Sequence, residues 1–255
     1  MPERLMAEAI GETGFYGKIP SQGDFVARRL RSDFVQQWDA WLQQWIAFSR
    51  EALGADWQQL YQDAPVWRFL LAPGTCGDSA WAGLFQPSVD RVGRYFPLTV
   101  AAALPGDLDV LETMSAARAW YDAVERTAAA AFTADVRLDD LDARLLAAQF
   151  PARAIIPEDA ADDTLPLAER TVNALMIAAG ADADFATVRT TLHEEQVNIG
   201  HSHCVWLNSA ATLNDQRVVL VTRSLPEPQL SCAFLNGRWV AHGWDDGRPD
   251  TRLSA

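Results

Sequence analysis

The chain has 255 residues, of which 34 are acidic and 21 basic, so its formal net charge is −13. A protein that binds nucleic acid presents a basic patch or stripe, so this balance argues against that class and equally against electrostatic docking to anionic lipid. Hydrophobic residues make up 49% of the chain and charged residues 22%, which is typical of a folded globular protein and excludes a wholly disordered one.

The first elements in chain order are a short strand and an aromatic helix. After a leader over 1–12 that we expect to be loose, Phe15–Ile19 alternates weakly and ends at Pro20, which indicates a strand followed by a turn through 21–23. Ser32 can cap a helix that we expect to end near Gly54. Its core-facing stripe has helical spacing: Phe34, Trp38, Trp41, Trp45 and Phe48.

Three strands and two helices are predicted next. The strands cover Val66–Leu71, Trp81–Phe85 and Tyr95–Ala103, each followed by a proline within a few residues. Asp109, with Glu112 three residues later, is typical of a capping box, and the helix it begins should run to about Phe132. A shorter helix is expected over 138–149.

The second half begins with a connector. Residues 151–166 hold three prolines and four acidic residues against one arginine, which is typical of a linker. We expect a helix over 167–179, strands over Cys204–Leu207 and Arg217–Thr222, and a tail over 246–255.

This order of elements predicts an α/β layered fold with helices on both faces of one sheet. Several connections between strands are too short for a right-handed helical crossover, so the sheet should be mixed and partly antiparallel. We expect a single domain over 13–245, because strands on both sides of the connector are needed to complete one sheet.

The segment around Lys18 only partly matches a phosphate-binding loop. That loop needs glycine where this chain has Glu12, and serine or threonine where it has Ile19. The segment is better interpreted as a strand end and a tight turn in which Lys18 pairs with a carboxylate such as Asp24. Ser21 and Asp24 with a distant histidine can still form a hydrolase site, although no nucleophile elbow is present.

The metal-binding signals are also incomplete. His201 and His203 would share one face of a strand, but Cys204 would point to the other. The three cysteines form no CxxC pair and fit neither a zinc ribbon nor a disulfide framework. We therefore expect no metal and no cofactor.

The turn over Pro87–Pro97 leaves two interpretations open. Arg91 and Arg94 can form a pair of guanidiniums that binds a carboxylate or phosphate. Alternatively, Asp90 pairs with either arginine and stiffens a long hairpin.

The termini and apolar runs carry no membrane signal. The segment MPERLMAEAIGETG contains acidic residues and no apolar core of a signal peptide, and runs such as Ala174–Ala179 fall far short of the ~18 residues that span a bilayer. We expect a soluble, cytoplasmic protein.

Two stretches, 14–45 and 66–99, are more specific than any catalytic motif. They contain GKIPSQGDF (Gly17–Phe25), WDAWL (Trp38–Leu42) and PSVDRVGRYFPLT (Pro87–Thr99). In order and spacing these pieces, within the diagnostic region over about 14–130, strongly resemble the N-terminal region of the TagF/ImpM family associated with type VI secretion. The C-terminal half is less diagnostic.

The resemblance implies a three-layer αβα sandwich and a cytoplasmic accessory protein of the bacterial type VI secretion system. Members of this family repress the system after translation and are linked to its forkhead-associated scaffold protein, which is therefore the expected partner. No catalytic residue or cofactor is established for the family, so none is carried over and we expect no enzyme.

The resemblance and the residues together give two hypotheses. The first is a regulatory binding protein. The alternative is a small-ligand-binding protein or hydrolase with a polar site around Lys18, Asp24, Asp90 and Arg94. The candidate contact residues are the polar positions of the family motifs: Lys18, Ser21, Asp24, Asp90, Arg91 and Arg94.

Overall fold

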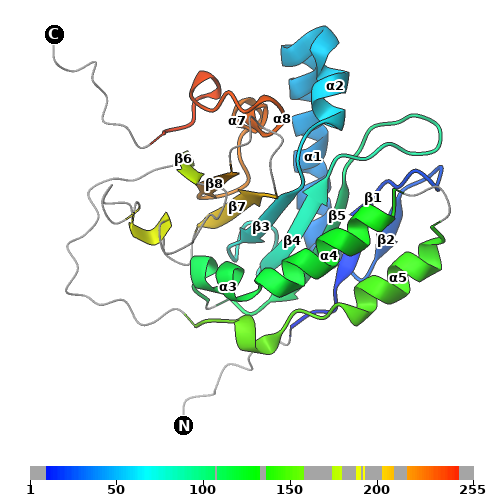
Figure 1. The fold of residues 1–255 in the computed structure, drawn as a ribbon, viewed down its shortest axis with the longest axis vertical. Helices are drawn as coiled ribbons and strands as arrows, with labels where there is room; N and C mark the ends of the chain where they lie inside the picture. Colours follow the sequence, from blue (N-terminus) through cyan, green and yellow to red (C-terminus); the bar gives the residue numbers. More distant parts are fainter. Residues whose placement is uncertain are drawn as a thin grey trace.

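The computed structural model describes residues 10–106, 108–132, 136–157, 174–179, 188–190, 192, 203–209 and 217–246. Its centre is an eight-stranded sheet in the order β2-β1-β5-β4-β3-β7-β8-β6, with helices on both faces (Figure 1). The strands are β1 (Gly14–Gly17), β2 (Val26–Arg28), β3 (Trp67–Leu71), β4 (Ala80–Gln86), β5 (Leu98–Leu104), β6 (Ala174–Ala179), β7 (Cys204–Asn208) and β8 (Arg217–Thr222).

The expectation of a mixed sheet is wrong, because every described pairing between these strands is antiparallel. Strands that follow each other in the chain, such as β3, β4 and β5, lie side by side and need no crossover. One isolated bridge, between Leu175 and Asp245, is parallel. The sheet takes strands from both sides of the connector.

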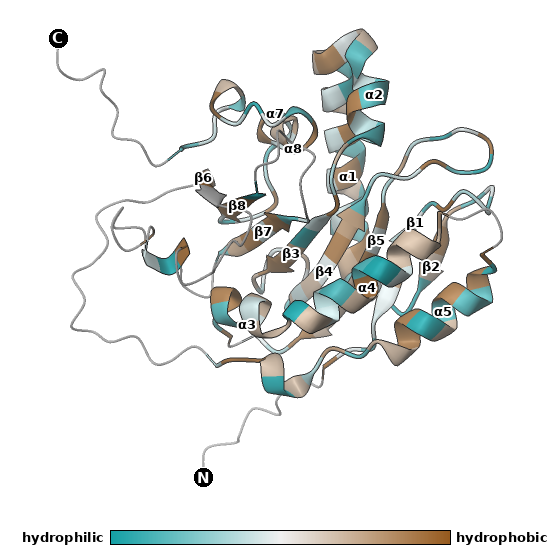
Figure 2. Ribbon diagram, in the orientation of Figure 1, coloured by the Kyte–Doolittle hydropathy of each residue, from teal (hydrophilic) through white to brown (hydrophobic). Residues whose placement is uncertain are grey.

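Two groups of helices cover the sheet. Against one face lie α1 (Ser32–Leu53), α2 (Trp57–Gln62), α7 (Pro228–Ser231) and α8 (Ala233–Asn236), and against the other lie α3 (Val110–Ala116), α4 (Arg118–Ala130) and α5 (Leu138–Ala147). Short 3₁₀ turns cover Gly54–Asp56, Ala152–Ala154 and Val240–His242. The strands are apolar and the outward sides of α4 and α5 are more polar (Figure 2), so each helix buries an apolar side on the sheet.

The aromatic stripe of α1 is confirmed except at its end. Phe34, Trp38, Trp41 and Trp45 are buried, whereas Phe48 is 40% exposed. The stripe repeats every 3.5 residues, and an α-helix turns once every 3.6, so the stripe drifts by about 20° per heptad and leaves the buried side. The tryptophans also satisfy their indole N–H groups; that of Trp38, for example, donates to Thr99 Oγ1 at 2.8 Å.

The helix expected from Asp109 to Phe132 is divided in two. Asp109 caps α3 by accepting two backbone N–H groups, as predicted. Ala117 then leaves the helical region, with φ −85° and ψ 7°, and α4 begins at the next residue. The backbone N–H of Asp109 donates to the carbonyl of Ile156, which ties the start of α3 to the segment after α5.

The helix expected over 167–179 is wrong where the structure describes it, since Ala174–Ala179 forms β6. A short apolar run such as ALMIAA fits a buried helix or a buried strand equally well, and pairing with the β-branched residues of β8 decides between them. Strand β2 and helix α2 were not predicted at all. The leader up to residue 9, the connector from 158 and the tail from 247 lie outside the described residues. No helix in the described ranges is long and apolar enough to cross a bilayer.

Gly83, in the middle of β4, tests how tightly the sheet centre is packed. A Cβ at this position would overlap the carbonyl oxygen of Val100 and lie 2.5 Å from Cζ of Phe69. Because overpacking a core costs about 1–3 kcal/mol, we expect Gly83→Ala to lower the free energy of unfolding by that amount in a urea titration.

The control is Gly106→Ala, whose new Cβ would make only ordinary contact, at 3.5 Å from Pro73 Cγ. Its stability should stay within about 0.5 kcal/mol of wild type. Equal stability of the two variants would contradict the packing at Gly83.

Candidate functional site

The six candidate residues lie on two neighbouring turns. Residues 17–25 link β1 to β2, residues 87–97 link β4 to β5, and β1 pairs with β5 so that Gly17 is opposite Leu98. A Cβ on Gly17, which has φ +137°, would overlap the carbonyl oxygen of Pro97, so only glycine permits this approach. We call residues 17–25 and 87–97 the joined turns; both lie at one end of the sheet in Figure 1.

The carboxylate of Asp90 holds the joined turns together. Its Oδ2 accepts hydrogen bonds from Lys18 Nζ at 2.8 Å and from Arg94 Nε at 2.7 Å. Its Oδ1 accepts the backbone N–H groups of Val92 at 3.0 Å and of Arg94 at 2.9 Å. The side chain of Asp90 is fully buried, and that of Lys18, the only lysine in the chain, is 5% exposed. The buried Asp90 carboxylate therefore fixes the tip of its own turn, 87–97, and the start of the neighbouring turn, 17–25.

These contacts decide the charge of Asp90. Burial alone would raise the pKa of this carboxyl, but the hydrogen bonds from Lys18, from Arg94 and from the backbone N–H of Val92 outweigh it. The pKa of Asp90 therefore lies well below its usual range, and the group stays ionised at neutral pH.

Backbone contacts also connect the two turns. The N–H of Arg91 donates to the carbonyl of Gln22 at 3.0 Å, and Ser88 Oγ donates to the carbonyl of Lys18 at 2.7 Å. Ser88 is itself buried. These bonds, together with those of Asp90, join the two turns into one unit.

The sequence predicts that Lys18 pairs with a carboxylate such as Asp24. In the structure the carboxylate that pairs with Lys18 is that of Asp90. The side chain of Asp24 is fully exposed and only approaches Arg94, at 3.8 Å. Of the two interpretations of the arginines, the stiffened hairpin is observed for Arg94, whose guanidinium also donates to the carbonyl of Gly23. Sequence separation hid the Lys18–Asp90 pair, because the two residues are 72 positions apart in the chain.

Two other candidates have different roles. The side chain of Arg91 is exposed and makes no ion pair within the described part of the chain. Ser21 Oγ is buried and has no hydrogen-bond partner among the described residues. The joined turns thus bring together Lys18, Asp90 and Arg94, while Arg91 and Asp24 face solvent.

An aromatic cluster beside these charges was missed by sequence reasoning. Phe25 is 48% exposed, yet its ring stacks on Tyr16 at 5.6 Å and meets the edge of Phe96 at 4.8 Å. Lys18 Nζ lies 4.9 Å from the centre of the Phe25 ring. Tyr16 donates its hydroxyl to Asp39 of α1 at 2.6 Å, and burial followed by this contact raises the pKa of Tyr16. The available signal was the place of Phe25 at the end of the GKIPSQGDF motif.

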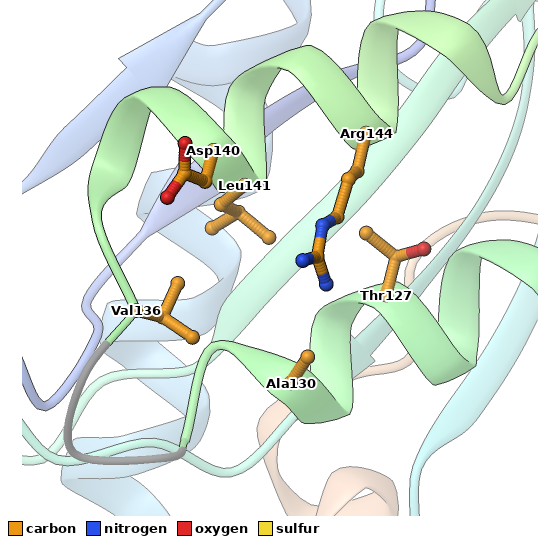
Figure 3. A pocket seen from close by; sticks show the side chains of 6 residues that line it. All are labelled: Thr127, Ala130, Val136, Asp140, Leu141 and Arg144. Atoms are coloured by element: carbon orange, nitrogen blue, oxygen red, sulfur yellow. The ribbon is translucent and has the colours of Figure 1, made fainter.

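A small hollow of about 110 Å³ lies elsewhere, between α4 and α5. Figure 3 shows the guanidinium of Arg144 reaching over it. None of the six candidate residues is among those that line it: Thr127, Ala130, Val136, Asp140, Leu141 and Arg144.

The other chemistry-bearing groups do not form a site with the joined turns. Within the described ranges no group of three histidine, cysteine or acidic residues is placed to hold a metal ion. His201 lies outside those ranges. The three cysteines are free and buried, and burial raises the pKa of Cys232 to about 11 and that of Cys76 further. These thiols are poor nucleophiles at neutral pH.

Comparison with known proteins gives a family for this architecture. Residues 14–148, which include both joined turns, match the family model described as TagF N-terminal domain, type VI secretion system-associated. The chain is also similar to PA0076 from Pseudomonas aeruginosa PAO1, a crystal structure at 2.05 Å resolution, with 30% identity and a TM-score of 0.69. That match covers 89% of this chain and 94% of the other. No curated protein matches the chain significantly.

Replacing Asp90 tests whether the buried carboxylate holds the site. Asp90→Asn keeps an oxygen for the backbone N–H groups but removes the charge that faces Lys18 and Arg94. Because removing one partner of a buried ion pair costs about 3–5 kcal/mol, we expect a loss of unfolding free energy of that order in urea at pH 7. Lys18→Met should cost less, since Arg94 and two backbone N–H groups still stabilise Asp90. Wild-type stability of Asp90→Asn would contradict this role.

The same carboxylate predicts a pH dependence with a definite sign. The pKa of Asp90 is lower in the folded protein than in the unfolded chain, where an aspartate has a pKa of about 4. Its contribution to stability is therefore fully present above about pH 4 and is lost as the pH falls towards the folded value. Between pH 7 and pH 3, the urea midpoint should fall further for wild type than for Asp90→Asn. Asp24→Asn, which makes the same charge change at an exposed side chain, is the control.

Proposed function

This chain belongs to the TagF family of type VI secretion system-associated proteins, and from that premise we propose that it represses the secretion system after translation. In this proposal it acts in the cytoplasm by binding a protein component of the system, and it is not an enzyme. The family match over 14–148, which includes the joined turns, is the observation that carries the proposal.

The partner we propose is the forkhead-associated scaffold protein of the secretion system. Family resemblance is the basis for this choice of partner. A rigid, solvent-facing unit such as the joined turns is compatible with it, because a surface that is already ordered loses little entropy when it binds another protein.

The geometry of the joined turns favours protein binding over the alternative of a small-ligand or hydrolase site. Lys18 and Asp90, two of the four groups that such a site would use, are buried and paired with each other. A ligand that took either group would have to break that ion pair, at a cost of several kcal/mol. Asp24 and Arg94 remain at the surface, where they can contact a partner.

Deletion of the gene tests repression. In a strain whose secretion system is expressed, we expect the deletion to raise secretion of a substrate of the system, with transcript levels of the secretion genes unchanged. Restoring the wild-type gene should lower secretion again. Unchanged secretion in the deletion strain would contradict the proposal, and a matching rise in transcripts would contradict action after translation.

The partner is tested separately with purified proteins. We expect the full chain to co-elute with the full-length forkhead-associated scaffold in size-exclusion chromatography. Separate elution at micromolar concentrations, together with a normal repression phenotype, would refute this partner and leave repression standing.

A further inference from the structure

The solvent side of the joined turns combines apolar and cationic side chains. Val92, at the tip of the 87–97 turn, is 64% exposed, and Phe25, on the other turn, is 48% exposed. The side chain of Arg94 is 55% exposed, and Arg91 is exposed as well. We call Phe25, Arg91, Val92 and Arg94 the turn surface.

We propose that the turn surface is the docking site for an acidic segment of a partner protein. Phe25 and Val92 would be the apolar anchors, and Arg91 and Arg94 would bind carboxylates of that segment. This inference rests on the proposed function and adds the surface that is used and the chemistry of the partner.

The first argument is the rigidity of the exposed residues. Phe25 is held by two aromatic rings and by the buried Lys18 ammonium, although half of its own surface faces water. The backbone of Val92 is held by the bond from its N–H to the Asp90 carboxylate. The exposed part of such a side chain buries no surface in the monomer, but it can bind a partner with little loss of conformational entropy.

The second argument is charge. The whole chain carries −13, whereas the turn surface presents two arginines beside one exposed carboxylate, that of Asp24, which lies 3.8 Å from Arg94. Arg91 makes no ion pair with any residue that the structure describes, and Arg94 keeps two of its bonds for Asp90 and Gly23 while half of it remains in solvent. Arg91 is therefore the guanidinium of this surface whose charge can pair with a carboxylate of a partner, and such pairing favours an acidic segment over a basic one.

The third argument is the chemical type of the residues on the turn surface. Arginine and aromatic side chains are enriched among the residues that dominate the energy of protein interfaces. Here an aromatic ring and two guanidiniums lie on one unit whose internal geometry is fixed by the Asp90 carboxylate. The salt-bridged scaffold beneath therefore serves to present the surface residues in one arrangement.

The test uses variants that change the surface and leave the buried ion pair intact. Arg91→Glu reverses a charge that has no partner in the described structure, and Phe25→Ser removes an anchor. Each has a matched control outside the turn surface: Arg118→Glu, at the exposed start of α4, and Leu146→Ser, a 39% exposed position on α5. Circular dichroism and urea unfolding of each full-length variant check that it folds.

Binding to the full-length forkhead-associated scaffold is measured by titration calorimetry at about 50 mM and about 300 mM NaCl, because the higher salt screens ion pairs at an exposed interface. We expect Arg91→Glu and Phe25→Ser to weaken binding about tenfold or more, as loss of a dominant interface residue does, and the controls to bind like wild type. The salt dependence should be smaller for Arg91→Glu than for wild type. Equal binding by wild type and both surface variants would overturn the assignment of the turn surface as the docking site, and it would leave the proposed function intact.

If the wild-type chain does not bind that scaffold, the proposed partner fails and a second measurement decides on the surface. A photo-crosslinking amino acid is placed at Val92 in the full chain, in cells that express the secretion system, with the same label at Leu146 as control. Support requires an adduct from Val92 alone, lost with Arg91→Glu, whose crosslinked peptide is rich in acidic residues. No adduct that depends on Arg91, or an adduct with a basic segment, would overturn the proposal.

Discussion

Burial of both faces of one antiparallel sheet is the constraint on which this structure depends. Strands β3, β4, β5 and β7 contribute buried side chains to both faces, so neither face can be left to solvent. The aromatic side of α1 covers one face and the apolar sides of α3, α4 and α5 cover the other. Because helices cover both faces, the exposed polar groups lie at the strand ends and on the outer sides of the helices.

The joined turns satisfy backbone polar groups that the antiparallel arrangement leaves without strand partners. Antiparallel pairing of β1 with β5 brings two irregular connections together at one end of the sheet, where their backbone groups lack strand partners. Hydrogen bonds between the two turns satisfy many of these groups. The Asp90 carboxylate accepts from Lys18, the Ser88 hydroxyl donates to the carbonyl of Lys18, and the carbonyl of Gln22 accepts the N–H of Arg91. The polar residues of the family motifs are thus divided between an internal framework, with Lys18 and Asp90, and a surface, with Arg91 and Asp24.

Elements with a strong local signal were predicted well. The stripe of Trp38, Trp41 and Trp45 indicated α1 and its buried side, and Asp109 marked the start of α3. The apolar run Ala174–Ala179 was assigned to a helix, because its length and composition suit both states and only its pairing with β8 selects the strand. The mixed sheet failed for a related reason: local patterns show which segments are strands, but the direction in which they pair depends on contacts between distant segments.

For the candidate site, the sequence by itself determined the family motifs and hence which polar residues belong together. It did so because GKIPSQGDF and PSVDRVGRYFPLT are specific strings that need no structure to be read. Only the tertiary structure decided that Lys18 pairs with Asp90 and not with the nearby Asp24, and that Phe25 and Val92 remain exposed. The physical reason is that an ion pair between residues 72 positions apart exists only once β1 and β5 are paired, and pairing alone sets which side chains the turns bury and which they present.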